Sequence, residues 1–191
     1  DGGVQPHEIT YVETHGTGTS LGDPIEAQAL GAVLGVGRPA DQPLMIGSVK
    51  TNMGHLESAA GIAGLLKAVL VLQHHAVPPH LHLRELSPHI PWERLPLVIP
   101  TELTPLDSLN RKQLAGVSAF GFSGTNCHIV LEEAPSVEQA SADVERTHHV
   151  LTLSAKTGEA LRQHAAQIAD HLVSHPDADL ANAAYTLNTG R

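Results

Sequence analysis

The chain has 191 residues, of which 41% are hydrophobic and only 3% aromatic, so one or two domains with an aliphatic core are possible. Acidic residues outnumber basic ones by 20 to 11, which gives a formal net charge of −9. Lys and Arg form no run or stripe, and we therefore expect no nucleic-acid partner.

The first elements predicted are a strand and a helix. Residues 9–13 form a short apolar segment that predicts a buried strand, and a glycine-rich turn follows it. Asp23, Pro24 and Glu26 then predict a helix start, with Asp as N-cap and Glu capping in return. The helix is expected to end near Gly35. Its predicted buried face consists of Ile25, Ala29, Ala32 and Val33.

The middle of the chain predicts a second strand and a second helix. Residues 44–49 are apolar and β-branched, as in a strand buried on both faces, and a polar loop follows at 50–57. Residues 59–72 are apolar on nearly every side and predict a helix enclosed by protein. This stretch is shorter than the roughly 20 residues that cross a bilayer, so no membrane span is expected. Residues 77–100 predict an ordered crossing segment with a short strand near 97–99.

A hairpin is predicted next. Residues 114–120 and 128–133 have the composition of strands, and a glycine-rich turn joins them. Cys127 is the only cysteine, which excludes an internal disulfide and fits a reducing, cytoplasmic setting. We expect Cys127 to be a small buried residue.

A composition break at residues 135–149 is predicted to connect a first domain, residues 1–134, to a smaller region, residues 150–191. The smaller region is predicted to contain a strand at 150–153 and helices at 158–174 and 179–187.

Two histidines occupy similar positions in the first domain. His15 follows the first predicted strand and His55 follows the second, and each has glycine neighbours that leave room for a ligand. Strand ends are where sites collect in layered α/β folds. His55 is also expected just before a helix N-terminus, which disfavours protonation. Two neutral imidazoles that donate N–H groups to one carbonyl would stabilise an enolate.

These residues lie within recognisable motifs. VETHGTGT at residues 12–19, with GDPIE at 22–26, resembles the first histidine motif of modular polyketide β-ketoacyl synthases. GSVKTNMGHLE at 47–57 resembles their second histidine motif. FGFSGTN at 120–126 resembles the glycine-rich hairpin near the end of the same domain. Residues 150–191 are similar to the start of the linker that joins a ketosynthase to an acyltransferase.

The resemblance implies the C-terminal half of an α/β, thiolase-like layered fold, followed by the start of a small α/β linker domain. It implies decarboxylative Claisen condensation of an acyl thioester with a malonyl-type extender. The implied partners are an acyl carrier protein, the N-terminal half of the ketosynthase and the adjacent acyltransferase, in a homodimeric parent. The implied cofactor is the phosphopantetheine of the carrier protein, with none bound directly to this chain.

The resemblance also assigns roles. His15 and His55 would hold the thioester carbonyl of the extender and stabilise the enolate, and Lys50 would tune the site electrostatically. The implied substrate-binding residues are Thr17, Thr19, Asn52 and Phe122. Taken alone, the threonines could equally cap backbone groups in the turn.

The family pattern is incomplete here. The chain lacks the cysteine elbow that precedes the first histidine motif, so we expect it to be cut from a longer protein and inactive alone. Gly64 stands nine residues after His55, where some bacterial fatty-acid synthases place a Glu. A non-elongating condensing domain remains possible, although its usual sign is loss of the first histidine. A non-catalytic fragment or scaffold also remains possible.

Two other chemistries are less favoured. A thiolase needs a cysteine before a glycine-rich turn, whereas Cys127 follows one. No metal site is predicted, since the histidines form neither His-Glu-x-x-His nor a Cys-x-x-Cys pair.

Overall fold

The computed structural model describes residues 2–106, 112–135 and 148–190. The chain divides into two compact units, Asp1–Pro135 and Ser136–Arg191.

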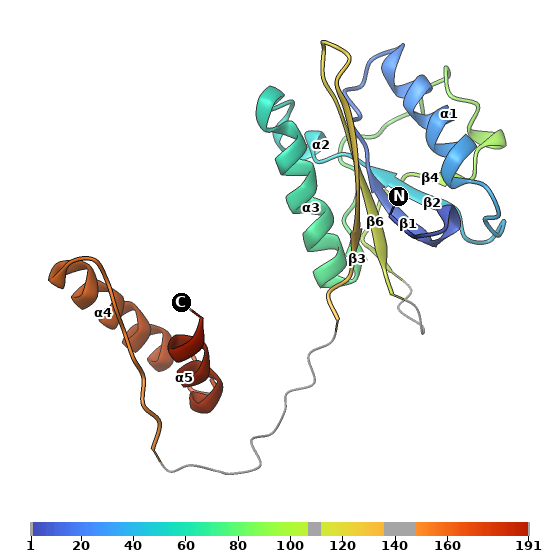
Figure 1. Cartoon of the computed structure of the whole chain (residues 1–191). Coiled ribbons are helices and arrows are strands. Elements are labelled where there is room, and N and C mark those ends of the chain that lie inside the picture. The colour runs from blue at the N-terminus through green and yellow to red at the C-terminus, as the bar shows by residue number, and fades with distance from the viewer. Residues whose placement is uncertain (1, 107–111, 136–147, 191) are drawn as a thin grey trace. The chain divides into compact units, whose positions relative to one another are not determined.

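The first unit contains a five-stranded sheet in the order β4-β2-β1-β6-β7 (Figure 1). Its strands are β1 (Ile9–Glu13), β2 (Leu44–Gly47), β4 (Leu97–Val98), β6 (Leu114–Phe120) and β7 (Asn126–Glu132). Strand β1 pairs in parallel with β2 and β6, β4 pairs in parallel with β2, and β7 is antiparallel to β6. All five strands were predicted, with shifts of one or two residues at some ends, and the α/β fold class is confirmed.

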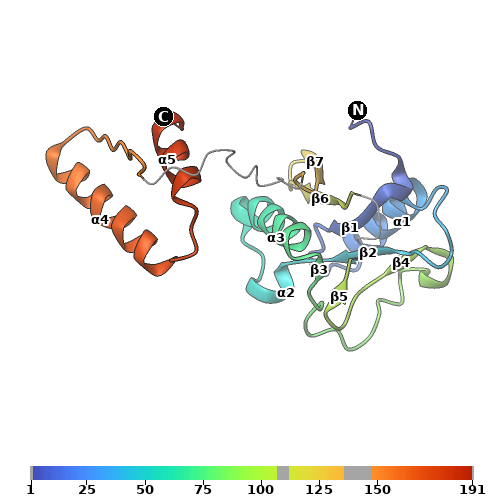
Figure 2. The same cartoon turned by 90° about the horizontal axis from the view of Figure 1, so that it is seen from below.

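Two helices cover opposite faces of the sheet (Figures 1 and 2). Helix α1 (Gly22–Leu34) packs Leu30 and Leu34 against one face, and α3 (Ala60–His74) packs Val71 and Leu72 against the other. Strand β1 lies between these two cores, and all five of its residues are buried. Its position explains why its sequence is apolar without the alternation of a half-exposed strand.

Several short elements complete the first unit. The predicted loop at 50–57 contains a helical turn, α2 (Lys50–Met53), and a 3₁₀ turn, η2 (Glu57–Ala59). Strands β3 (Ala76–Val77) and β5 (Thr104–Pro105) form a separate antiparallel pair that was not predicted. Two more 3₁₀ turns are η1 (Pro6–Glu8) and η3 (Trp92–Arg94).

The predicted buried face of α1 is wrong. Ile25 and Val33 are 61% and 60% exposed, whereas Ala27, Leu30 and Leu34 are buried. The face turned to the sheet carries the two leucines of the helix core, and it also places the Glu26 carboxylate against the backbone that follows β1. Apolar burial and hydrogen bonding therefore favour the same orientation.

The prediction that the second helix is enclosed on every side is also wrong for the described residues. Along α3, Ile62, Leu66 and Leu70 are each more than half exposed. They recur at four-residue spacing and therefore form one stripe on the helix. A helix that is apolar all round needs partners on two sides, and the described residues supply them on one.

Cys127 was predicted to be buried and is instead exposed. It lies on β7, at the edge of the sheet, where five of the seven strand residues are exposed. The prediction failed because small size and low polarity do not reveal whether a strand is central or at an edge.

The second unit contains two helices, α4 (Gly158–Ser174) and α5 (Leu180–Thr189), as predicted. The predicted strand at 150–153 is absent from the described part of the chain. Thr152 instead donates its N–H and hydroxyl to Asn188 Oδ1, and Asn188 Nδ2 donates to the Val150 carbonyl. The Asn188 side chain on α5 thus forms hydrogen bonds with backbone groups that a strand would pair with a neighbouring strand. None of the described helices is long and apolar enough to cross a membrane.

Candidate functional site

Two segments leave the same edge of the sheet. The first histidine segment is residues 14–19, with His15, and the second is residues 49–57, with His55. Strands β1 and β2 are parallel neighbours with Glu13 opposite Gly47, so their carboxyl ends meet. Thr14 tightens this junction, since both its N–H and its hydroxyl donate to the Gly47 carbonyl, at 2.8 and 2.9 Å. His15 follows Thr14 directly, and Lys50 begins the turn after β2.

The structure brings His15 and His55 together. Their ring centroids are 5.7 Å apart and the rings are nearly perpendicular. His15 also lies against Phe120, at the end of β6, with ring centroids 5.3 Å apart. Three segments that are distant in sequence thus converge on one place.

Backbone hydrogen bonds orient both imidazoles. The N–H of Phe120 donates to Nδ1 of His15 at 3.3 Å, and the N–H of Glu57 donates to Nδ1 of His55 at 3.2 Å. An accepting Nδ1 carries no proton, so in each neutral ring the proton is on Nε2. In each neutral ring, Nε2 therefore carries an N–H that can donate to a ligand.

The Glu26 carboxylate binds the backbone of the first histidine segment. Its carboxylate accepts from the N–H groups of His15 and Gly16, at 2.8 and 3.0 Å, and the residue is 6% exposed. The predicted capping role of Asp23 and Glu26 is therefore wrong. Leu21 is the N-cap, and Asp23 accepts from the N–H of Gly18 at 3.1 Å. Both acids bind the preceding loop rather than their own helix.

The surroundings of His15 favour its neutral form. Desolvation lowers its pKa, and the positive charge of Lys50 lowers it further, while Asp23 opposes the shift. The pKa of Lys50 is also lowered by desolvation, against the raising effects of Glu13 and Glu26. Burial raises the pKa of Glu26, and its two backbone hydrogen bonds oppose that shift.

The predicted substrate-binding residues do not share one location. Thr17 lies with Lys50 on a cavity of about 450 Å³, whereas Asn52 lies on a separate apolar groove of about 760 Å³ along α3. Thr19 uses its Oγ1 to accept from the N–H of Gly22, as a turn cap does. Phe122 is fully exposed at the tip of the β6–β7 hairpin, so within this chain it forms no pocket wall.

No group of three or more His, Cys, Asp or Glu residues within 2–106, 112–135 and 148–190 could hold a metal ion.

Comparison with known families finds matches over nearly the whole chain. Residues 1–84 match the family described as beta-ketoacyl synthase, C-terminal domain. Residues 87–191 match the ketoacyl-synthetase C-terminal extension. The chain belongs to the β-ketoacyl synthase family.

Relatives of this ketosynthase region are large synthases. The chain is 48% identical over 192 residues to a subunit of the phenolphthiocerol/phthiocerol polyketide synthase of Mycobacterium tuberculosis, covering 99% of this chain and 10% of that protein. It is 48% identical over 189 residues to erythronolide synthase EryA2 of Saccharopolyspora erythraea, covering 99% of this chain and 5% of the synthase. The chain thus spans a tenth or less of these relatives.

Solved structures show the same fold. The ketosynthase from module 6 of the bacillaene synthase of Bacillus subtilis 168 superposes with a TM-score of 0.77 at 41% identity. The module 1 ketosynthase from Bacillus amyloliquefaciens FZB42 gives 0.78 at 39% identity. Each comparison covers 99% of this chain and 32% of the other, so the chain corresponds to about a third of a ketosynthase. The thiolase-like assignment is confirmed.

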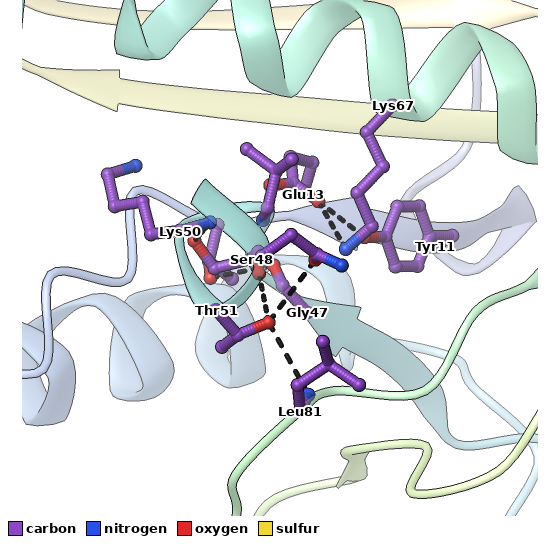
Figure 3. Close-up of polar contacts among 11 residues, drawn as sticks. Tyr11, Glu13, Gly47, Ser48, Lys50, Thr51, Lys67 and Leu81 are labelled. Carbon is purple, nitrogen blue, oxygen red and sulfur yellow. Dashed lines mark hydrogen bonds and ion pairs between the residues drawn. The ribbon is translucent and has the colours of Figure 1, made fainter. Parts of the chain in front are cut away.

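Sequence reasoning missed one acid at the site of this ketosynthase region. Glu13 is 1% exposed at the end of β1, and its carboxylate contacts Tyr11 and Lys67 (Figure 3). It also accepts from the N–H of Val49. Two signals were available, namely an acid that ends an apolar strand and a lone lysine within an apolar helix. Together they indicate a buried ion pair. Gly64 packs beside this acid, because a Cβ there would lie 3.0 Å from Glu13 Cγ.

Proposed function

We propose that this chain supplies the two-histidine half of a ketosynthase active site, which decarboxylates a malonyl-type extender in a modular polyketide synthase. The observation that carries the proposal is the His15–His55 pair, with rings 5.7 Å apart and each Nδ1 occupied by a backbone N–H. Two Nε2–H donors are then available for one carbonyl oxygen, which is the arrangement that stabilises an enolate.

The proposed step uses both donors. The C–C bond between the α-carbon and the carboxylate of the extender breaks, CO₂ leaves, and the electron pair passes to the thioester carbonyl as an enolate. The Nε2–H groups of His15 and His55 stabilise the negative oxygen. The α-carbon then attacks an acyl thioester held elsewhere in the ketosynthase and expels a thiolate. No proton needs to leave either histidine, so their neutral state suffices.

Lys50 supports this chemistry through its charge. Desolvation and the charge of Lys50 both lower the pKa of His15, which favours the neutral ring whose Nδ1 accepts from Phe120 and whose Nε2–H can donate. Desolvation lowers the pKa of Lys50 itself, while Glu13 and Glu26 counter that effect. We therefore assign Lys50 an electrostatic role, with no bond made to it.

The remaining parts of the reaction belong to the parent protein in this proposal. They are the cysteine nucleophile, the other two thirds of the ketosynthase, a neighbouring acyltransferase, and an acyl carrier protein whose phosphopantetheine delivers both substrates. Thr17 is the better placed of the two threonines for contact with that arm, since Thr19 already caps the N–H of Gly22. We propose a homodimeric, cytoplasmic parent. The chain alone is expected to form no acyl-enzyme, because it has no cysteine elbow.

The test is CO₂ release from a malonyl-type extender on its carrier protein, measured with the intact ketosynthase. We expect His15→Ala and His55→Ala each to slow release by about 100-fold or more, the usual effect of removing one oxyanion donor. His89→Ala is the matched control, since His89 is exposed and outside the site. Unchanged release in both active-site variants would overturn the proposal.

The same measurement separates the alternatives. A non-elongating condensing domain would transfer acyl groups without releasing CO₂, even as the wild type. A scaffold would do neither.

A further inference from the structure

A buried ion pair lies beneath the second histidine segment. Lys67 reaches from α3 to the Glu13 carboxylate, with Nζ 3.0 Å from Oε2, and the two side chains are 10% and 2% exposed (Figure 3). The hydroxyl of Tyr11 donates to the same oxygen. Lys67 Nζ also lies 5.6 Å from the centroid of the Tyr11 ring. One carboxylate oxygen is thus held by two partners.

The other carboxylate oxygen is directed at the backbone of the site. Oε1 of Glu13 accepts from the N–H of Val49, a residue that is 6% exposed. Val49 is the N-cap of α2 (Lys50–Met53), the turn that carries Lys50 and leads through Gly54 to His55. Val49 has no side-chain cap bond of its own in α2. The acid on β1 therefore fixes the first residue of the second histidine segment.

Two glycines make room for this cluster. A Cβ at Gly64 would lie 3.0 Å from Glu13 Cγ, and a Cβ at Gly47 would lie 3.2 Å from Tyr11 Oη. Both distances are tighter than ordinary packing. Glu13 therefore packs closely against α3, and Tyr11 packs closely against β2.

We propose that Glu13 is a positioning residue of the ketosynthase: its Oε1 holds the Val49 N–H so that Lys50 and His55 face His15. Lys67 and Tyr11 hold the carboxylate in the orientation that this requires. The proposal rests on the proposed decarboxylation. It assigns Glu13 no contact with substrate.

The charge of Glu13 has a secondary effect on the same segment. Three titratable groups on other elements interact electrostatically with Lys50. They are Glu13 on β1, Glu26 on α1 and His15 in the loop after β1. Desolvation lowers the pKa of Lys50 and the two acids partly offset that shift, so Glu13 also favours the protonated form of this lysine. Holding the Val49 N–H needs only an acceptor, whereas this second effect needs a negative charge.

Two double variants separate positioning from simple charge pairing. Glu13→Leu/Lys67→Met and Glu13→Gln/Lys67→Met both remove the ion pair and carry the same net charge. Only the Gln variant keeps a carbonyl oxygen that can accept from Val49. Single variants would leave one buried charge unpaired, which the double variants avoid. The Leu variant still removes the acceptor of both the Tyr11 hydroxyl and the Val49 N–H, whereas the Gln variant keeps one carbonyl oxygen. A surface pair, Lys112 with Glu132, is the control, and Glu132→Gln/Lys112→Met removes an exposed ion pair.

The measurements are made on the intact ketosynthase. We expect Glu13→Leu/Lys67→Met to lower kcat for CO₂ release by about 100-fold with little change in KM, because the reacting groups are misplaced while the binding surface remains. Glu13→Gln/Lys67→Met should stay within about 5-fold of the wild-type kcat. The surface control should match the wild type. Amide hydrogen exchange at Val49 should accelerate only in the Leu variant, which is a readout independent of activity.

Equal kcat values and equal Val49 exchange in the two double variants would overturn the inference, provided the wild type releases CO₂. A wild type that releases no CO₂ would instead defeat the proposed function. In that case Val49 exchange still decides whether Glu13 holds the segment.

Discussion

The two histidine segments are held in different ways. The first, residues 14–19, has the N–H groups of His15 and Gly16 bound to Glu26, and His15 is half-buried with its Nδ1 accepting from the N–H of Phe120 on β6. The second, residues 49–57, is bound at its first residue by Glu13, while His55 is exposed and its Nδ1 accepts from the N–H of Glu57 in the same segment. The first segment is thus bound by acids close to its histidine, whereas the second is bound at Val49 and at Thr51, whose Oγ1 accepts from the N–H of Leu81 at 3.4 Å.

This difference assigns separate tasks to two buried acids. Glu26 accepts two N–H groups at the histidine itself, whereas Glu13 acts six residues before His55. Loss of Glu26 should therefore displace His15 directly. Loss of Glu13 should free the Val49 N–H and so displace His55 indirectly, through the residues between Val49 and His55.

The largest effect is expected for Glu26. Glu26→Ala leaves the N–H groups of His15 and Gly16 without an acceptor, which should cost about 2–4 kcal/mol of unfolding free energy. CO₂ release should fall by about 100-fold or more. Glu26→Gln keeps one acceptor and should lose about half as much stability. Denaturant titration and the release assay check both. An alanine variant with wild-type stability would show that the first segment does not depend on its hydrogen bonds to Glu26.

An intermediate effect is expected for Gly64→Ala. The new methyl would lie 3.0 Å from Glu13 Cγ, so Glu13 must shift and its hold on Val49 should weaken. We expect a stability loss of about 1–3 kcal/mol, as for an overpacked core. Gly61→Ala on the same helix is the control, since its Cβ would meet Ala119 Cβ at an ordinary 3.5 Å. That control should gain up to about 1 kcal/mol from helix propensity. Equal stability of the two variants would show that Glu13 can move freely.

The comparison also shows how far sequence reasoning reached. Strand ends, glycines and flanking motifs were enough to predict that His15 and His55 converge, because parallel neighbouring strands must end at one edge. The sequence could not show which acid binds which backbone. Glu26 stands where a capping acid is expected, and only the packing of α1 on the sheet reveals that it points to His15. Local patterns predict elements, whereas such contacts depend on tertiary geometry.

The errors have a similar origin. The exposed stripe on α3 and the exposed Cys127 on β7 both depend on which neighbours are present, and composition does not specify neighbours. The apolar segment at 150–153 is a comparable case, since a single side chain, Asn188, takes its backbone groups. Strand propensity alone therefore gave the wrong result there.

The smallest expected effect is a pKa change at His15. Desolvation and Lys50 lower its pKa, so His15 should titrate below the value of about 6.5 that an unperturbed histidine shows. Removing the lysine charge by Lys50→Met should raise the pKa of His15 toward that value. NMR titration of the His15 imidazole signals in the wild type and the variant measures this change.

The sign of the stability effect follows from the same shift. A lowered pKa means that the unfolded chain takes up the proton first as pH falls, so the contribution of a neutral His15 is complete above the unfolded pKa. That contribution is lost as pH drops from about 6.5 to the lowered folded pKa. In Lys50→Met the two pKa values lie closer together, and the stability loss over this range should shrink. An identical pH dependence in the variant and the wild type would show that Lys50 does not act on His15.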